Sequence, residues 1–119
     1  MRQRVYVETS FVSYLTSRPS RDLVVAGHQQ ITHDWWNKRQ HGYDLFISQL
    51  VLDEAGAGDA LAATERLDVL QAMTLLQTTN EAFVLAQELL RKGALPAKAA
   101  DDALHIAIAA TQSIKYLMT

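Results

Sequence analysis

The stretch RVYVETS, residues Arg4–Ser10, decides the fold class that we expect for this chain. Its first part is a short run of β-branched and aromatic residues, which is typical of a buried strand. The run closes on an acid, Glu8, and two hydroxyl residues, Thr9 and Ser10, follow that can cap a helix. A strand that passes directly into a helix is the start of a βα unit. We therefore predict a first strand over Val5–Val7 and a short helix from Thr9 or Ser10.

The same alternation of short apolar runs and longer helical patterns continues to the end of the chain. The further strands are predicted over residues 45–47, 74–77 and 115–118. The helices between them are predicted over residues 22–38, 48–55, 59–70, 78–93 and 96–113. Such alternation is typical of parallel sheets with helices on both faces. The fold class we predict is α/β, a three-layer α/β/α domain with a central parallel sheet.

Local signals place the helix ends. Ser48 and Asp59 are predicted N-caps, and Thr78 with Glu81 three residues later has the spacing of a capping box. Pro96 is predicted to lie in the first turn of the last helix. In the predicted helix over residues 22–38, a roughly aligned set shares one face: Leu23, Gly27, Ile31 and Trp35.

Size and composition restrict the class of protein. The chain has 119 residues, 49% of them hydrophobic and 20% charged, which suits one globular domain over residues 1–119. It has no cysteine, which agrees with a cytoplasmic location. Glu8 interrupts the N-terminal apolar run too early for a signal peptide, and no apolar stretch is long enough to cross a membrane. With a net charge of −2, any nucleic-acid binding would depend on local basic patches.

Three carboxylates stand at equivalent places along this pattern. Glu8 closes the first strand, Glu54 lies about one helical turn after the second, and Asp102 opens the helix that leads to the last. In an open parallel sheet, ligands bind outside the carboxyl ends of the strands. Three acids there would form an oxygen-rich pocket that suits Mg²⁺ or Mn²⁺, and would indicate metal-dependent chemistry on phosphates. Each acid alone also has a simpler interpretation as a solvated surface group, and the neighbours Asp53 and Asp101 fit that interpretation better.

Other candidate residues keep two interpretations each. His105, three residues after Asp102, either orients a metal ligand or is a partly buried helix histidine. Arg18 and Arg21 either clamp a phosphate or lie in a solvated loop. Of Trp35 and Trp36, we expect one ring to pack in the core. The other would either stack on a nucleic-acid base or fill a dimer interface. Together with the aliphatic content of the chain, this pair favours a homodimer.

The motifs resemble those of PIN domains. Residues 5–10 are similar to the first motif of that family, residues 48–54 to the second, and residues 96–107 to the third. The resemblance spans the whole chain and implies Mg²⁺- or Mn²⁺-dependent ribonuclease activity. For small bacterial members it implies a VapC-type toxin with a cognate antitoxin. It also implies that Glu8, Glu54 and Asp102 bind the metal. In such a site we expect Thr9 and Ser10 to offer hydroxyls and helix-start amides to the substrate, and His105 and Thr119 to lie beside the ligands.

Two departures from the family pattern bear on activity. The first acid is usually an aspartate, whereas this chain has the longer Glu8. The family also continues after its fourth strand with a Thr-x-Asn or Thr-x-Asp element and a further strand, whereas this sequence stops at Thr119. We therefore expect weak, Mn²⁺-favoured cleavage from the 119-residue form. The rival hypothesis is a catalytically impaired PIN-like scaffold that acts in binding or dimerisation. A phosphorylation receiver domain fits poorly, because the third predicted strand is not followed by an aspartate in residues 75–80.

Overall fold

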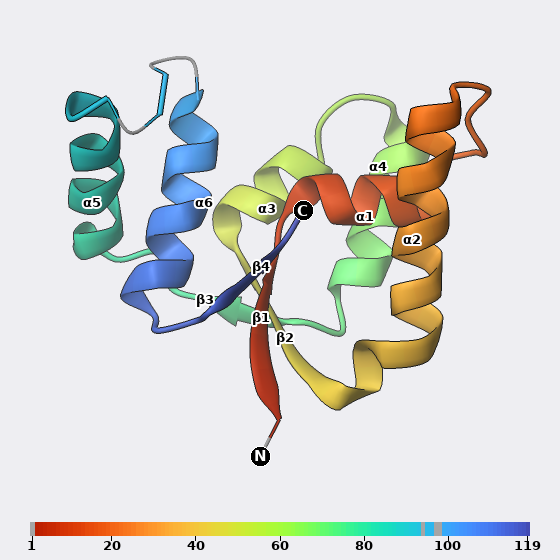
Figure 1. Ribbon diagram of the computed structural model, residues 1–119, viewed down its shortest axis with the longest axis horizontal. Helices are drawn as coiled ribbons and strands as arrows, with labels where there is room; N and C mark the ends of the chain where they lie inside the picture. The colour runs from red at the N-terminus through yellow and green to blue at the C-terminus, as the bar shows by residue number, and fades with distance from the viewer. Residues whose placement is uncertain (1, 94, 97–98) are drawn as a thin grey trace.

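A four-stranded, fully parallel sheet forms the centre of the protein (Figure 1). The computed structural model describes residues 2–93, 95–96 and 99–119. The strands are β1 (Gln3–Val7), β2 (Tyr43–Ser48), β3 (Thr74–Leu76) and β4 (Tyr116–Met118), in the spatial order β3-β2-β1-β4. The predicted α/β class and parallel sheet are confirmed, and each predicted strand overlaps an observed one.

Six α-helices of the described residues flank this sheet: α1 (Thr9–Thr16), α2 (Leu23–Arg39), α3 (Gln49–Ala55), α4 (Ala60–Leu70), α5 (Asn80–Arg91) and α6 (Ala100–Thr111). A short 3₁₀ turn, η1 (Gln40–Gly42), joins α2 to β2. Figure 1 shows α5 and α6 as a pair on one side of the sheet and α1, α2 and α4 on the other. Across the part of the chain that the structure describes, no helix is both long and apolar enough to span a bilayer.

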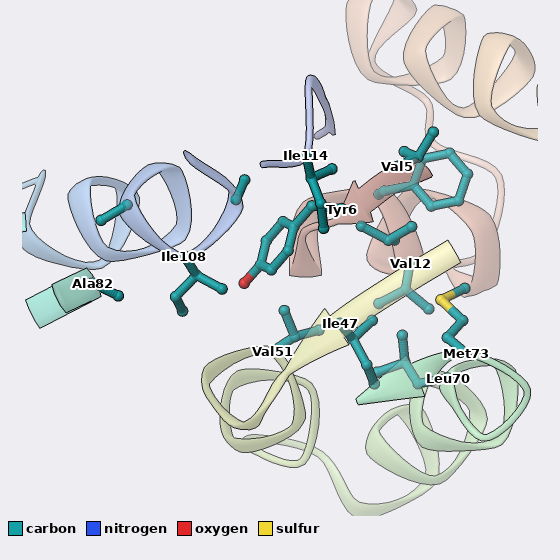
Figure 2. Close-up of a cluster of buried hydrophobic side chains, with 14 of the residues drawn as sticks. Val5, Tyr6, Val12, Ile47, Val51, Leu70, Met73, Ala82, Ile108 and Ile114 are labelled. Carbon is teal, nitrogen blue, oxygen red and sulfur yellow. The ribbon is translucent and has the colours of Figure 1, made fainter. Parts of the chain in front are cut away.

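The central strand β1 is covered on both faces. Val5, Tyr6 and Val7 are all buried, because a parallel strand with helices on each side has no solvated face. Figure 2 shows Tyr6 between Ile108 of α6 on one side and Val51 of α3 on the other. The carboxyl end of β1 lies beside three helices, α1, α3 and α6, and the candidate site lies between them.

Two predicted caps are wrong, by one or two residues. Glu8, and not Thr9 or Ser10, is the N-cap of α1, and its carboxylate accepts the amide hydrogen of Ser10. Thr79, and not Thr78, caps α5 by accepting from the amide of Ala82. Glu81 is then the second residue of the helix, too early for the reciprocal bond of a capping box. The predicted caps Ser48 and Asp59 are confirmed.

The bounds of α6 also differ from the prediction. The helix begins at Ala100, so Pro96 precedes it, and residues 97 and 98 lie outside the described part of the chain. The helix ends at Thr111, and Ser113 adopts a left-handed conformation with φ 58°. The amides of Ser113 and Ile114 donate to the carbonyls of Ala110 and Ala109 in a Schellman pattern. This turn buries Ile114 and directs the chain into β4.

Most of the apolar stripe expected on α2 does not face the core, and only its last member, Trp35, packs there. Leu23 and Ile31 are 88% and 69% exposed, whereas Gln29 is buried. The Gln29 amide donates to the Ser17 hydroxyl and the Arg18 carbonyl and accepts from the Ser20 amide, which ties the preceding loop to the helix. The hydrogen bonds of Gln29 to this loop therefore determine which side of α2 faces the interior. Trp35 and Trp36 both contact Phe11, with ring centroids 5.6 and 6.3 Å apart, so both indoles belong to the core boundary.

Candidate metal centre

Glu8 follows directly from the end of β1. Its amide donates to the carbonyl of Met118 in β4 at 2.9 Å, so the sheet holds its backbone. Its carboxylate accepts from the Ser10 amide at 3.2 Å and lies 3.4 Å from the Ser10 hydroxyl. The residue is only 9% exposed. Glu8 is thus an anionic helix cap at the centre of the sheet edge, where the N-terminal end of α1 favours negative charge.

Glu54 comes to the same place from α3. Ser48, the last residue of β2, starts that helix by accepting from the Val51 amide at 3.4 Å. Glu54 lies further along the helix, and its Oε1 accepts from the Thr9 hydroxyl at 2.5 Å. The adjacent Asp53 is exposed and accepts from the Gln49 side chain, as expected for the solvated member of the pair. The two βα units of β1 and β2 therefore meet through these side chains.

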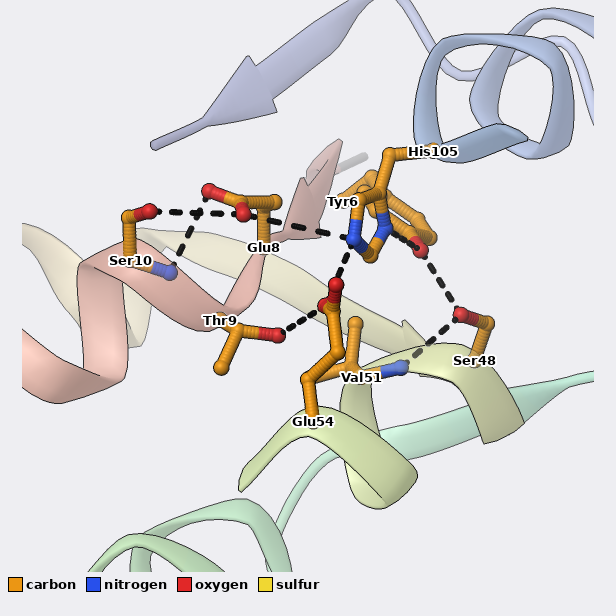
Figure 3. Close-up of polar contacts among 8 residues, drawn as sticks. All are labelled: Tyr6, Glu8, Thr9, Ser10, Ser48, Val51, Glu54 and His105. Carbon is orange, nitrogen blue, oxygen red and sulfur yellow. Dashed lines mark hydrogen bonds and ion pairs between the residues drawn. The ribbon is translucent and has the colours of Figure 1, made fainter. Parts of the chain in front are cut away.

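His105 of α6 completes the cluster. Its Nε2 lies 2.8 Å from Oε1 of Glu54 and 4.0 Å from Oε1 of Glu8. One ligand atom from each of these three residues lies within 4.8 Å of the others (Figure 3). The sequence left two alternatives for His105, a buried helix histidine or a neighbour of a metal ligand. The residue is only 1% exposed and it also contacts Glu54, so both descriptions apply.

Behind His105 lies a buried pair of hydroxyls. The Tyr6 hydroxyl is 2.7 Å from Nδ1 of His105 and 2.7 Å from Oγ of Ser48. Sequence reasoning did not assign a role to Tyr6 or to the side chain of Ser48 beyond capping. The available signal was a tyrosine in a strand expected to be buried on both faces, because a buried phenol usually finds a hydrogen-bond partner.

The environment raises the pKa of Tyr6 well above its usual value. Burial is the main cause, since the charged phenolate would lose its hydration, and the nearby carboxylates of Glu54 and Glu8 add to it. The hydrogen bond with Ser48 acts in the opposite direction and does not offset burial. Tyr6 therefore keeps its proton at neutral pH and always has one hydrogen to donate.

Asp102 lies outside this tight cluster. It is exposed, in the first turn of α6, and lines a cleft of about 340 Å³ together with Glu8, His105 and Thr119. The structure thus brings Glu8 and Glu54 together with His105, and puts Asp102 and Thr119 at the border of the same site. Helix geometry explains the difference, because positions three apart share a side of the helix but lie about one turn apart along it.

The expected substrate-contacting residues divide into two groups. Thr9 and Ser10 line a second cleft of about 410 Å³ next to Glu8 and Glu54. Arg18 and Arg21 are exposed in the loop that follows the opposite end of α1, and neither lines the two clefts. Eight helical residues place that loop roughly 12 Å from the acids. The geometry therefore supports Thr9 and Ser10 as site residues and leaves Arg18 and Arg21 in the solvated loop.

The donor set suits a divalent cation. Two carboxylates lie close together, that of Glu8 nearly buried and that of Glu54 half-buried, and within the described ranges neither forms an ion pair with a Lys or Arg side chain. Carboxylate, hydroxyl and water oxygens are the ligands that Mg²⁺ and Mn²⁺ prefer. A cation at this position would offset the repulsion between Glu8 and Glu54.

Comparison with known proteins identifies the family. The family model described as the PIN domain matches residues 5–119. The chain belongs to the PIN domain family. No curated protein matches its sequence significantly.

Two solved structures have the same fold as this PIN domain. The toxin VapC20 of Mycobacterium tuberculosis, described as cleaving the sarcin–ricin loop, superimposes with a TM-score of 0.72 at 17% identity, over 95% of this chain and 86% of that one. A chain of VapBC2 from Rickettsia felis, bound to a DNA fragment from its promoter, gives a TM-score of 0.67 at 16% identity, over 98% and 87%. At these identities the likeness shows the shared PIN fold.

Proposed function

We propose that this PIN domain is a metal-dependent endoribonuclease and the toxin of a toxin–antitoxin pair. The observation that carries the proposal is the meeting of Glu8 and Glu54, from separate βα units, beside His105 in an open cleft. The fold shared with VapC20, whose description names cleavage of the sarcin–ricin loop, supports the choice of RNA as substrate. The fold shared with a VapBC2 chain supports an antitoxin partner. We place both proposed roles, RNA cleavage and antitoxin binding, in the cytoplasm.

The three acids have distinct tasks in this proposal. Glu8 and Glu54 would hold Mg²⁺ or Mn²⁺, and Asp102, at the border of the cleft, would add a third carboxylate. When bound, the ion supplies Lewis acidity for the addition of water across a phosphodiester P–O bond. Thr9 and Ser10 lie beside Glu8 at the start of α1 and line the cleft that would receive the phosphodiester.

A second candidate is a PIN scaffold that binds partners without cleaving RNA. The exposed position of Asp102, outside the group formed by Glu8, Glu54 and His105, favours it, because an ion held by fewer carboxylates is bound more weakly. A homodimer is compatible with both candidates. Exposed apolar side chains such as Leu23, Ile31 and Leu61 offer surface for such contacts.

RNA cleavage with Mg²⁺, with Mn²⁺ and with EDTA tests the proposal. Glu54→Gln keeps the size of the side chain and removes its charge, and Asp53→Asn is the matched control on the adjacent, exposed position. We expect cleavage by the wild type and by Asp53→Asn, and none by Glu54→Gln or in EDTA. Cleavage by Glu54→Gln at the wild-type rate would contradict the proposed site. Binding of an antitoxin without cleavage under any condition would support the scaffold.

A further inference from the structure

Four side chains form one continuous hydrogen-bonded chain from the interior to the candidate site. It runs from Ser48 at the end of β2 to Tyr6 of β1, then to His105 of α6 and to Glu54 of α3. The successive distances are 2.7, 2.7 and 2.8 Å. Ser48 and Tyr6 are fully buried. Figure 3 shows the two hydroxyls on the side of the imidazole ring that faces away from Glu8 and Glu54.

The hydrogens of this chain can be arranged in two directions. In the first, Ser48 donates to Tyr6, Tyr6 donates to Nδ1 of His105, and the ring donates from Nε2 to Glu54. Every hydrogen then has an acceptor. In the reverse direction Nδ1 donates to Tyr6 and Tyr6 to Ser48, and the Ser48 hydrogen has no acceptor among the hydrogen bonds of the described residues. Ser48 already accepts from the Val51 amide, and a buried hydroxyl without a partner is costly.

The contact at the other end of the chain selects the same direction. Nε2 of His105 lies 2.8 Å from a carboxylate oxygen, a hydrogen-bond distance. Without a hydrogen, the Nε2 lone pair would face the lone pairs of Glu54.

We propose that the Ser48–Tyr6–His105 chain fixes His105 in the tautomer with hydrogen on Nε2, so that this histidine positions Glu54 and does not itself bind the metal. The inference rests on the proposed metal-dependent function, and it assigns roles within that site. Thr9 and His105 both donate to Oε1 of Glu54, and no hydrogen bond of the described residues reaches Oε2. Oε1 thus anchors the carboxylate, and Oε2 is left for the cation.

Nitrogen NMR of histidine-labelled, metal-free protein tests the tautomer directly, because protonated and bare ring nitrogens resonate far apart. The signals that disappear in His105→Gln identify the ring among the four histidines of the chain. We expect hydrogen on Nε2 and none on Nδ1, and we expect that pattern to persist when Mg²⁺ is added to saturation. A ring with hydrogen on Nδ1, on both nitrogens, or with Nε2 deprotonated by Mg²⁺ would overturn the inference. The last result would make His105 a metal ligand.

Mn²⁺ affinity, measured by electron paramagnetic resonance, tests the positioning role without an activity assay. We expect Tyr6→Phe and His105→Leu to weaken Mn²⁺ binding by about 10-fold, the loss typical of a residue that orients a ligand. His105→Gln keeps a donor near the Nε2 position and should bind close to wild type. Tyr43→Phe is the matched control, because the Tyr43 hydroxyl makes no side-chain hydrogen bond in the described part of the chain.

The two measurements separate this inference from the proposed function. If wild-type protein shows the Nε2 tautomer but no Mn²⁺ binding that depends on Glu54, the hydrogen-bond chain exists and the metal-dependent function is wrong. If wild-type protein binds Mn²⁺ and His105→Leu binds it equally well, the site exists and the positioning role is wrong.

Discussion

Tyr6→Phe is the substitution whose effect on stability can best be derived from the structure. It removes one oxygen from a fully buried position and leaves Ser48 and His105 without their shared partner. A buried polar group that loses its partner costs about 1–3 kcal/mol, partly offset here because the phenyl ring needs no hydrogen bond. We expect a loss of about 2–4 kcal/mol in the free energy of unfolding. That is below the ~5–15 kcal/mol typical of a domain, so the variant should still fold.

The pH dependence of this loss provides an independent check. The pKa of Tyr6 in the folded protein is raised above the ~10 of an unfolded chain, so its contribution to stability is fully present below pH 10. As the pH rises above 10, the unfolded state releases the proton first, and the contribution declines by up to about 1.4 kcal/mol per pH unit. The difference between wild type and Tyr6→Phe should therefore shrink above pH 10.

Urea denaturation of the wild type, Tyr6→Phe and the control Tyr43→Phe, at pH 8 and at pH 11, measures both effects. We expect Tyr43→Phe to change the free energy of unfolding at pH 8 by less than about 1 kcal/mol, as for a half-buried tyrosine whose hydroxyl has no side-chain partner among the described residues. A loss below about 1 kcal/mol for Tyr6→Phe, or a loss that is equal at the two pH values, would refute the argument that this phenol is a buried, doubly hydrogen-bonded group.

Asp102→Asn should lower the rate of RNA cleavage by more than about 100-fold, which is more than the loss of a residue that only orients a ligand costs. The fold should stay intact because the side chain is exposed, and cleavage at the parent rate would show that the carboxylate has no part in the reaction. Arg18→Ala and Arg21→Ala should each leave cleavage nearly unchanged, since neither residue lines a cleft beside the acids, and a strong loss of rate would restore the phosphate-clamp hypothesis. Light scattering should report a homodimer, and a 13.3 kDa species at high concentration would reject it.

The sequence by itself determined the class of fold and the proximity of two acids, Glu8 and Glu54, at the candidate site. Short β-branched runs that alternate with helical patterns indicate a parallel sheet, and a strand such as Val5–Val7 needs only its own composition to be recognised. Glu8 and Glu54 were found for the same reason, because parallel strands end at a common edge. Position along the chain was sufficient to bring these two acids together.

Only the tertiary structure decided which other side chains face them. The ring of His105 meets Tyr6 and Glu54 because α6 packs on one of the two covered faces of β1, whereas Asp102, one turn earlier, is left at the border. The inward face of α2 was likewise decided by Gln29 and its loop, against the apolar stripe of its sequence. Helical and strand periodicity are properties of neighbours in sequence, but hydrogen bonds across some 50 to 100 residues depend on how the elements pack.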